Sequence, residues 1–326
     1  MGIGMTKLLP GIHEAIGNTP IVNLSRITQK YGVVGNIYAK LEYLNPGFSK
    51  KDRIARQIIE EAEKEGTLKP GQPVVELTSG NTGTGLAIVC AVKGYKCYAC
   101  MSKGNSEERA RMMNALGAEV VLVDQMPNSV KGQVSGEDLA LVEEKACKLV
   151  EELGAFRANQ FLLQGNVHAH EYYTAKEIWE QCGGNIDAFA DFMGTGGSFA
   201  GCAKSFKKQN GDIRCYAVEP AAAAIYSKRE IKDGLHKIQG GGYAMELPLV
   251  PPDLIDGVLM VSDEKAIETA RNLARYEGIF AGFSSGANVF AALSLLEGQE
   301  KGKNIVVLLN DSGLKYLSTD LYEGGQ

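Results

Sequence analysis

The stretch DAFADFMGTGGSFAG, residues 187–201, shows how this chain is built. Its first seven residues are apolar apart from two aspartates and predict a strand, and the residues from Ser198 onward predict a helix. The turn between them consists of Gly194, Thr195, Gly196, Gly197 and Ser198. Backbone N–H groups without bulky side chains at a helix start form a cup for a phosphate monoester, and the helix dipole strengthens it. This turn is therefore a candidate phosphate site.

A dinucleotide site is the alternative for the same turn. In the nicotinamide-binding fingerprint a third glycine would stand at Phe199, and its absence argues against that cofactor. Glu219, at the end of the next predicted strand, nonetheless resembles the acidic residue that binds ribose in that fingerprint. The turn alone leaves both alternatives open.

Strand and helix patterns alternate through the whole chain. Short apolar segments predict strands at 36–43, 73–78, 96–101, 119–124, 155–161, 187–194, 214–220, 257–262 and 304–311. Amphipathic segments predict helices at 51–66, 83–92, 106–116, 136–153, 171–181, 198–209, 263–276 and 285–296. This alternation predicts an α/β fold with mainly parallel sheets, and nine strands favour two sheets.

The composition favours a globular protein that acts on small molecules. The 326 residues are 44% hydrophobic, and the 34 basic and 39 acidic residues are interspersed, with a formal net charge of -5. No basic face recommends nucleic acid or an anionic membrane as a partner. No run of 18 apolar residues could span a bilayer, and the N-terminal residues lack the apolar core of a secretion signal. We therefore expect a cytoplasmic protein.

The cysteines point to a reducing compartment. They are seven, an odd number, and are scattered through apolar segments. The CYAC motif at 97–100 lies in a strand-like segment without a second pair, which favours buried thiols over a redox or zinc site. Only His168 and His170 stand near ligand spacing, so we expect no metal centre.

A second polar turn, LTSGNTGTGLA at 77–87, also leads from a predicted strand into a predicted helix. Small hydroxyl residues and glycines at such a point expose several donors, as a carboxylate or phosphate requires. The residues that offer them are Thr78, Ser79, Asn81 and Thr82. The alternative is a capping residue followed by flexible glycines.

A third turn, GFSSGAN at 282–288, opens another predicted helix with Ser284. It is not the nucleophile elbow of a hydrolase, because His236 is the last histidine and no partners follow in a suitable order. A neutral hydroxyl here would suit a ring nitrogen, and a simple helix cap is the alternative.

Two adjacent lysines, Lys50 and Lys51, stand at the start of the amphipathic segment 51–66. Positive charge is unfavourable at a helix N-terminus. Desolvation and positive surroundings lower the pKa of a lysine and make its amine nucleophilic, so one of the pair is a candidate nucleophile. Solvated surface lysines beside Asp52 and Arg53 are the alternative.

Together these features resemble one family along the whole chain. The lysine segment, TSGNTG, GTGGS, HKIQG, GFSSG and DSGLKYLST occur in the order and spacing of the cysteine synthase and cystathionine beta-synthase family. These are pyridoxal phosphate enzymes of fold type II, related to the tryptophan synthase beta chain. The resemblance implies two open, mostly parallel α/β domains with the cofactor in the cleft between them.

The resemblance also implies roles for particular residues. Lys51 matches the lysine that forms an imine with pyridoxal phosphate, and Lys50 replaces a common valine, so we expect Lys50→Ala to leave turnover intact. The expected cofactor-binding residues are Lys51, Asn81, Gly194, Thr195, Gly196, Gly197, Ser198 and Ser284. The expected substrate-binding residues are Thr78, Ser79, Asn81, Thr82, Gln160, Gly241, Gly242 and Tyr243.

The implied domains are residues 1–159, with Lys51, the carboxylate loop and a mobile part around 47–155, and residues 160–326, with the phosphate loop and Ser284. A segment at about 10–40 is a candidate to pack with the second domain. The resemblance also implies a homodimer.

The implied reaction is β-replacement on an O-activated serine or cysteine through an aminoacrylate, as in cysteine synthase (O-acetylserine sulfhydrylase). The partners are then an amino acid and a thiol or sulfide, with neither nucleic acid nor membrane. Alternatives are a cystathionine beta-synthase-like enzyme, a sulfide-releasing cysteine β-lyase that forms serine, lanthionine or pyruvate, and a non-catalytic regulator that binds pyridoxal phosphate.

The sequence departs from the usual cysteine synthase pattern where the second substrate is chosen. GGGYAMELP at 240–248 replaces a common glycine-rich segment, and Tyr243 resembles the tyrosine of cystathionine beta-synthases. NQFLLQ at 159–164 and Leu77 also differ from the common residues. Sulfide, homocysteine, a second cysteine, an amine and water therefore remain open as nucleophiles.

Overall fold

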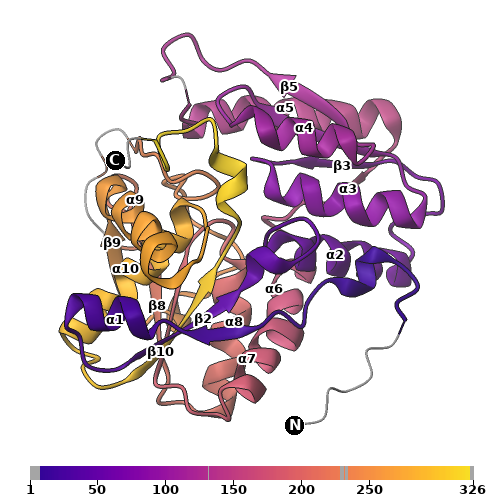
Figure 1. Cartoon of the computed structure of the whole chain (residues 1–326). Coiled ribbons are helices and arrows are strands. Elements are labelled where there is room, and N and C mark those ends of the chain that lie inside the picture. Colours follow the sequence, from indigo (N-terminus) through magenta and orange to yellow (C-terminus); the bar gives the residue numbers. More distant parts are fainter. Residues whose placement is uncertain (1–7, 131, 228–230, 232–233, 324–326) are drawn as a thin grey trace.

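The computed structural model contains two β-sheets, and the larger one has six strands and lies in the lower part of Figure 1. The model describes residues 8–130, 132–227, 231 and 234–323. The order of the six strands is β1 (Ile21–Asn23), β2 (Asn36–Leu41), β10 (Asn304–Leu309), β7 (Ala188–Phe192), β8 (Arg214–Pro220) and β9 (Gly257–Val261). Only the β1–β2 pair is antiparallel.

The central strands of this sheet are buried on both faces. In β10, Ile305 and Val307 pack into one apolar cluster, whereas Val306 and Leu308 pack into another on the opposite face. Successive side chains of a strand point to opposite faces, so a continuous apolar run is what a sheet covered by helices on both sides requires.

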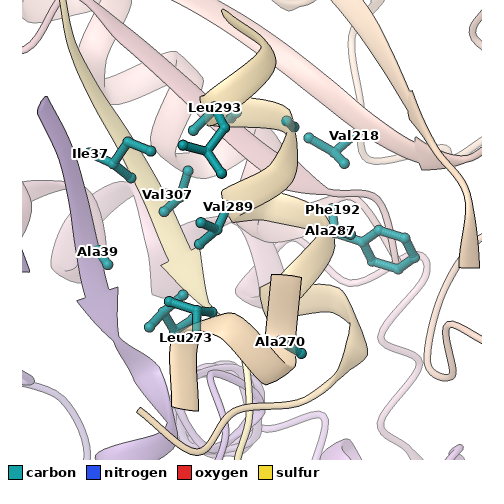
Figure 2. Close-up of a cluster of buried hydrophobic side chains, with 14 of the residues drawn as sticks. Ile37, Ala39, Phe192, Val218, Ala270, Leu273, Ala287, Val289, Leu293 and Val307 are labelled. Carbon is teal, nitrogen blue, oxygen red and sulfur yellow. The ribbon is translucent and has the colours of Figure 1, made fainter. Parts of the chain in front are cut away.

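Helices cover both faces of the large sheet. One cluster joins α1 (Ser25–Tyr31), α9 (Asp263–Asn272) and α10 (Phe283–Glu297) to the sheet, and Figure 2 shows α10 running along it with Val289 and Leu293 beside β10 and β2. The opposite cluster contains residues of α6 (Gly165–Ala169), α7 (Ala175–Gln181) and α8 (Gly197–Gln209).

The smaller sheet is entirely parallel, with the order β5 (Glu119–Val123), β4 (Cys97–Ser102), β3 (Val74–Leu77) and β6 (Phe156–Arg157). Its helices are α2 (Lys51–Glu65), α3 (Asn81–Lys93), α4 (Glu107–Ala115) and α5 (Gly136–Leu153). Figure 1 shows this sheet and its helices as a separate magenta lobe above the large sheet, with α2 between the two.

The α/β prediction with two open, mostly parallel sheets is confirmed. Each of the nine predicted strands overlaps a strand of the structure, whereas the sequence analysis predicts neither β1 nor α1. The helix predicted at 171–181 begins earlier, because α6 leads into a π turn before α7. Shorter turns are 3-10 at Ile12–Ala15, Glu42–Leu44, Pro252–Leu254 and Gly313–Tyr316, and π at His170–Thr174 and Leu273–Glu277.

Three further observations concern the described residues only. All seven cysteines lie among them and are unpaired. None of the helices in this part of the chain has the length and apolar character needed to cross a membrane. The same residues contain no group of three His, Cys, Asp or Glu side chains that could hold a metal ion.

Candidate active site

The polar turns predicted from the sequence meet in one pocket at the carboxyl ends of β3, β7 and β10. Its lining residues are Lys50, Lys51, Asn81, Phe192, Gly194, Thr195, Ser198, Gln239, Gly240, Ser284 and Asn310. In open α/β sheets ligands bind at this edge. The lysine segment is tied to β10, because the Lys50 N–H donates to the Asn310 carbonyl at 2.9 Å.

The glycine turn after β7 has no room for a side chain at Gly196 or Gly197. Gly196 has φ +80°, and a Cβ atom on it would lie 2.1 Å from Val250 Cγ2. A Cβ atom on Gly197 would lie 2.1 Å from Asn166 Oδ1. Helix α8 starts at Gly197, and the first N–H groups of a helix have no partner within it. The turn therefore presents backbone donors, which suits a phosphate.

Lys51 is the first residue of α2, and its Nζ donates to Thr195 Oγ1 of the glycine turn at 3.4 Å. Burial, followed by the positive charge of Lys50, lowers the pKa of the Lys51 amine to about 7, although Asp191 and Glu76 oppose the shift. An amine with this pKa is largely neutral just above pH 7 and can act as a nucleophile or base.

Lys50 lies in the same pocket, which the sequence analysis missed. Its residue is only 6% exposed, and its Nζ donates to both carboxylate oxygens of Asp191 and to Ser198 Oγ. The expectation that Lys50→Ala leaves turnover intact is revised, because this variant would leave the Asp191 charge buried without its partner. The sequence signal for this role was Lys50 itself, a charged residue at a position where the family commonly has valine.

Ser284, in the first turn of α10, accepts a hydrogen bond from Asn310 Nδ2 at 3.1 Å. A hydroxyl that accepts one bond still has its own proton to donate. The Ser284 proton can therefore go to an acceptor in the pocket, such as a ring nitrogen.

Asn81 lines the pocket, but its amide is held from behind. Its Nδ2 donates to Asp311 at 2.8 Å, and its Oδ1 accepts from Lys315 Nζ at 2.6 Å. Burial lowers the pKa of Lys315 to about 8, with the Asp311 and Asp52 carboxylates opposing the shift. Both partners, Asp311 and Lys315, belong to the DSGLKYLST motif at 311–319. The sequence analysis used this motif for the family resemblance but assigned no role to these two residues.

In the second polar turn, at 77–87, Asn81 lines the pocket, whereas Thr78 and Thr82 form hydrogen bonds within the protein. Thr78 Oγ1 accepts from the N–H groups of Gly80 and Gly83 at 2.9 and 3.0 Å, so it stabilises the start of α3. Thr82 Oγ1 donates to Gln160 Oε1 at 2.6 Å. The prediction that Thr82 and Gln160 belong to one group of side chains thus agrees with their contact across 78 residues of sequence.

The segment 240–248, which contains the predicted residues Gly241, Gly242 and Tyr243, reaches the pocket through Gly240. A Cβ atom on Gly241 would lie 2.6 Å from a ring carbon of Phe192, and one on Gly242 would lie 2.4 Å from Pro220. Neither residue lines the pocket. Tyr243 is next to Ser79, and burial raises the pKa of its hydroxyl while a hydrogen bond with Ser79 opposes the shift.

Known proteins resemble this chain along nearly its whole length. The sequence model of a family described as pyridoxal-phosphate dependent enzymes matches residues 12–311. The chain belongs to this family. The cysteine synthase of Staphylococcus aureus strain Mu50 is 41% identical to this member over 317 residues, which are 97% of this chain and 98% of that protein. The family resemblance seen in the sequence is therefore confirmed.

Solved structures of other members have the same fold. An O-acetylserine sulfhydrylase isoform from Entamoeba histolytica is 36% identical with a TM-score of 0.90, covering 100% of this chain and 95% of that one. An O-ureido-L-serine synthase is 36% identical with a TM-score of 0.88, at 98% and 97% coverage. A hydrogen sulfide-producing enzyme from Fusobacterium nucleatum is 41% identical with a TM-score of 0.87, at 95% and 100% coverage.

The chemistry of the pocket fits pyridoxal phosphate, the cofactor of this family. The glycine turn offers N–H donors where a Cβ atom at Gly196 or Gly197 would collide with its neighbours. Ser284 has a hydroxyl proton to give, and Lys51 has an amine with a pKa of about 7. These three groups match the phosphate, the pyridine nitrogen and the aldehyde of the cofactor.

Proposed function

We propose that this enzyme catalyses β-replacement on an O-activated serine, with O-acetylserine and sulfide as substrates and cysteine as product. The observation that carries the proposal is the Lys51 amine, which donates to Thr195 of the glycine turn and has its pKa lowered to about 7, in a chain 41% identical to a cysteine synthase. When bound, pyridoxal phosphate supplies an electron sink that allows the β-substituent to leave and a nucleophile to add.

In this proposal the large sheet holds the cofactor. Lys51 forms the covalent link, and the N–H groups of residues 194–198 bind the phosphate. Ser284 donates to the pyridine nitrogen and Asn81 to the ring hydroxyl; one Asn81 amide proton goes to Asp311, and an amide has a second. Because a neutral hydroxyl leaves the ring nitrogen unprotonated, this site favours chemistry at Cβ.

Lys51 also moves the proton. With a pKa of about 7, its Nζ is about half neutral at pH 7, so it can accept the proton that the substrate loses from Cα and return one after the nucleophile has added to Cβ. Thr195 Oγ1, 3.4 Å away, orients this amine in the structure.

We propose that the residues after β3 bind the α-carboxylate of the amino acid. The Ser79 hydroxyl, the Gln160 amide and the backbone N–H groups of Asn81 and Thr82 at the start of α3 provide neutral donors. The Thr82 hydroxyl donates its proton to Gln160 and so holds that side chain in place. A cavity of about 530 Å³ shares Gln239 with the cofactor pocket and is lined by charged side chains of both signs, Lys103, Lys237, Glu107 and Asp320. We propose that it admits the zwitterionic amino acid.

The boundary between residues 1–159 and 160–326 also remains a proposal. The four-stranded sheet uses strands from residues 74–157, and the N-terminal strands β1 and β2 pair within the six-stranded sheet. We propose that the part around 47–155 moves as a unit when the carboxylate binds and excludes water from the reacting Cβ.

We further propose a cytoplasmic homodimer. The unpaired cysteines suit a reducing compartment. Exposed apolar side chains suit a subunit interface, and they include Leu44, Leu162, Tyr172 and Tyr173. Light scattering on a size-exclusion column tests the dimer, and a monomer at micromolar concentration would contradict it.

The experiment that tests the reaction supplies the holoenzyme with O-acetylserine and sulfide and measures cysteine. Borohydride reduction and digestion, followed by mass spectrometry, locate the pyridoxyl group, which we expect on Lys51. Incubation with cysteine alone tests the sulfide-releasing alternative. This alternative is considered because the 41% identical enzyme from Fusobacterium nucleatum is described as hydrogen sulfide-producing. Faster sulfide release from cysteine than cysteine formation would overturn the proposed direction.

A further inference from the structure

Lys50 and Asp191 form a buried ion pair at the cofactor pocket. The distances from Lys50 Nζ are 2.9 and 3.1 Å to the Asp191 oxygens and 2.7 Å to Ser198 Oγ. The side chain of Lys50 is 8% exposed and that of Asp191 is fully buried. Burying two charges costs several kcal/mol per ion unless the geometry and the remaining hydrogen bonds compensate. A pair in this position therefore calls for a function.

Asp191 interrupts an apolar strand. Phe189, on the same face of β7, and Met193, the residue after the strand, both belong to the hydrophobic core. The carboxylate accepts from Lys50, from Ser198 and, at 3.0 Å, from Asn288 Nδ2. With these donors around it, Asp191 is a fixed acceptor that determines where the Lys50 ammonium lies.

The orientation of the pair places its positive end toward the pocket. Lys50 lines the pocket together with Gly194, Thr195 and Ser198 of the glycine turn, whereas Asp191 lies behind them and does not line it. The pair is neutral overall, but a ligand in the pocket meets the ammonium first. An anion is therefore the ligand that this arrangement favours.

Ser198 cannot serve the phosphate in this arrangement. Its hydroxyl donates to Asp191 Oδ2 and accepts from Lys50 Nζ. A hydroxyl has one proton, so Ser198 Oγ has none left for a ligand. The charged donor next to it is Lys50.

Resting on the proposed function, we propose that Lys50, held by Asp191, is a further cofactor-binding residue whose ammonium faces the phosphate of pyridoxal phosphate. The glycine turn otherwise offers only neutral donors, namely its backbone N–H groups and the Thr195 hydroxyl. The three ammonium protons already go to Asp191 and Ser198, so Lys50 acts on the phosphate through its charge, and the attraction between opposite charges is stronger in a buried pocket than in water. The same ammonium also lowers the pKa of the Lys51 amine, so one charge serves both ends of the cofactor.

The test compares the cofactor with its phosphate-free analogue. The variant is Lys50→Met/Asp191→Asn, which removes both charges together and so avoids an unpaired buried ion. Apoprotein prepared with hydroxylamine is titrated with pyridoxal phosphate and with pyridoxal. We expect the Kd of pyridoxal phosphate to rise about tenfold or more and that of pyridoxal to stay within about twofold.

Two further variants sharpen the result. Lys40 is also fully buried, and its Nζ lies 2.7 Å from Glu177 outside the pocket, so Lys40→Met/Glu177→Gln is the matched control and should change neither Kd. Asp191→Asn removes the acceptor that positions the ammonium and leaves that charge buried without its partner, so its Kd for pyridoxal phosphate should also rise, by about threefold or more.

Three outcomes would overturn the proposal. They are an unchanged Kd for pyridoxal phosphate in the double variant, equal losses for both compounds, and an unchanged Kd for pyridoxal phosphate in Asp191→Asn. Failure of the proposed function is visible separately, because the unchanged protein would then form no borohydride-reducible bond at Lys51.

Discussion

The two sides of the pocket are built from different interactions. On the cofactor side, β7 and β10 are almost wholly buried, and the Lys50–Asp191 ion pair lies beneath the glycine turn. On the substrate side, Thr82 and Gln160 are joined by a hydrogen bond between neutral groups, and the edge strand β5 is partly exposed along its length. The permanently bound cofactor thus lies next to a buried ion pair, whereas the α-carboxylate of the exchanging substrate meets neutral groups.

This difference has an energetic reason. A neutral hydrogen bond contributes only about 0.5–1.5 kcal/mol, so a ligand can replace it at little cost. Removing one partner of a buried ion pair costs about 3–5 kcal/mol. We therefore expect changes on the cofactor side to weaken binding of the cofactor, and changes on the substrate side to raise KM.

Lys51→Ala has the largest expected effect. It removes both the covalent link and the proton-transfer group, so kcat should fall by more than about 10³-fold. The visible absorbance of the lysine-bound cofactor should disappear as well. Lys64→Ala, an exposed position on the same helix, is the control and should change neither. A normal absorbance spectrum of dialysed Lys51→Ala protein would contradict the assignment.

Gly197→Ala tests the rigidity of the cofactor side. The new Cβ atom would lie 2.1 Å from Asn166 Oδ1, so the turn or Asn166 must shift. Overpacking of this kind costs about 1–3 kcal/mol, which corresponds to cofactor binding that is roughly 5- to 150-fold weaker. Equilibrium titration of the apoprotein measures it. Gly211→Ala, where a Cβ atom has open space, is the control. Equal affinities in the two variants would show that the cofactor side is softer than we infer.

The pH dependence of cofactor uptake tests the amine itself. The Lys51 pKa is about 7, lowered mainly by burial, and only the neutral amine attacks the aldehyde. The rate of imine formation in the apoprotein should therefore rise with pH by about tenfold between pH 6 and 8 and then level off. Stopped-flow absorbance measures this rate. A rate that continues to rise up to pH 10 would indicate an ordinary lysine.

Thr82→Val has the smallest expected effect. It keeps the shape of the side chain but removes the hydroxyl that donates to Gln160. The KM for the amino acid should rise about fivefold, as expected for one neutral hydrogen bond, while the Kd of the cofactor stays unchanged. Steady-state kinetics and apoprotein titration measure the two. A loss of cofactor affinity in this variant would remove the distinction between the two sides.

Much of the fold and of the site could be predicted from the sequence because its signals are local. Apolar runs of strand length followed by glycine-rich turns identified nine strands and the turn at 194–198. Strand β1 has only three residues, Ile21–Asn23, which is too short for a periodic pattern. The chain therefore reveals well those features that are encoded within about ten consecutive residues.

The contacts between distant segments could not be predicted in this way. Lys50 reads as a surface lysine until Asp191, 141 residues further along, is brought beside it. Asp191 itself was a signal, as a carboxylate within an apolar strand. The roles of Asp311 and Lys315 around Asn81 likewise depend on tertiary packing between the ends of the chain.

The strand order of the large sheet has a consequence for synthesis on the ribosome. β10, at residues 304–309, lies between β2, at 36–41, and β7, at 188–192. The N-terminal hairpin of β1 and β2 therefore has to wait for the last strand before it can join the sheet, and such distant pairing is slow. Until then the nascent chain exposes an unpaired strand edge. Chaperone dependence during expression should accordingly be greatest for chains truncated just before residue 304.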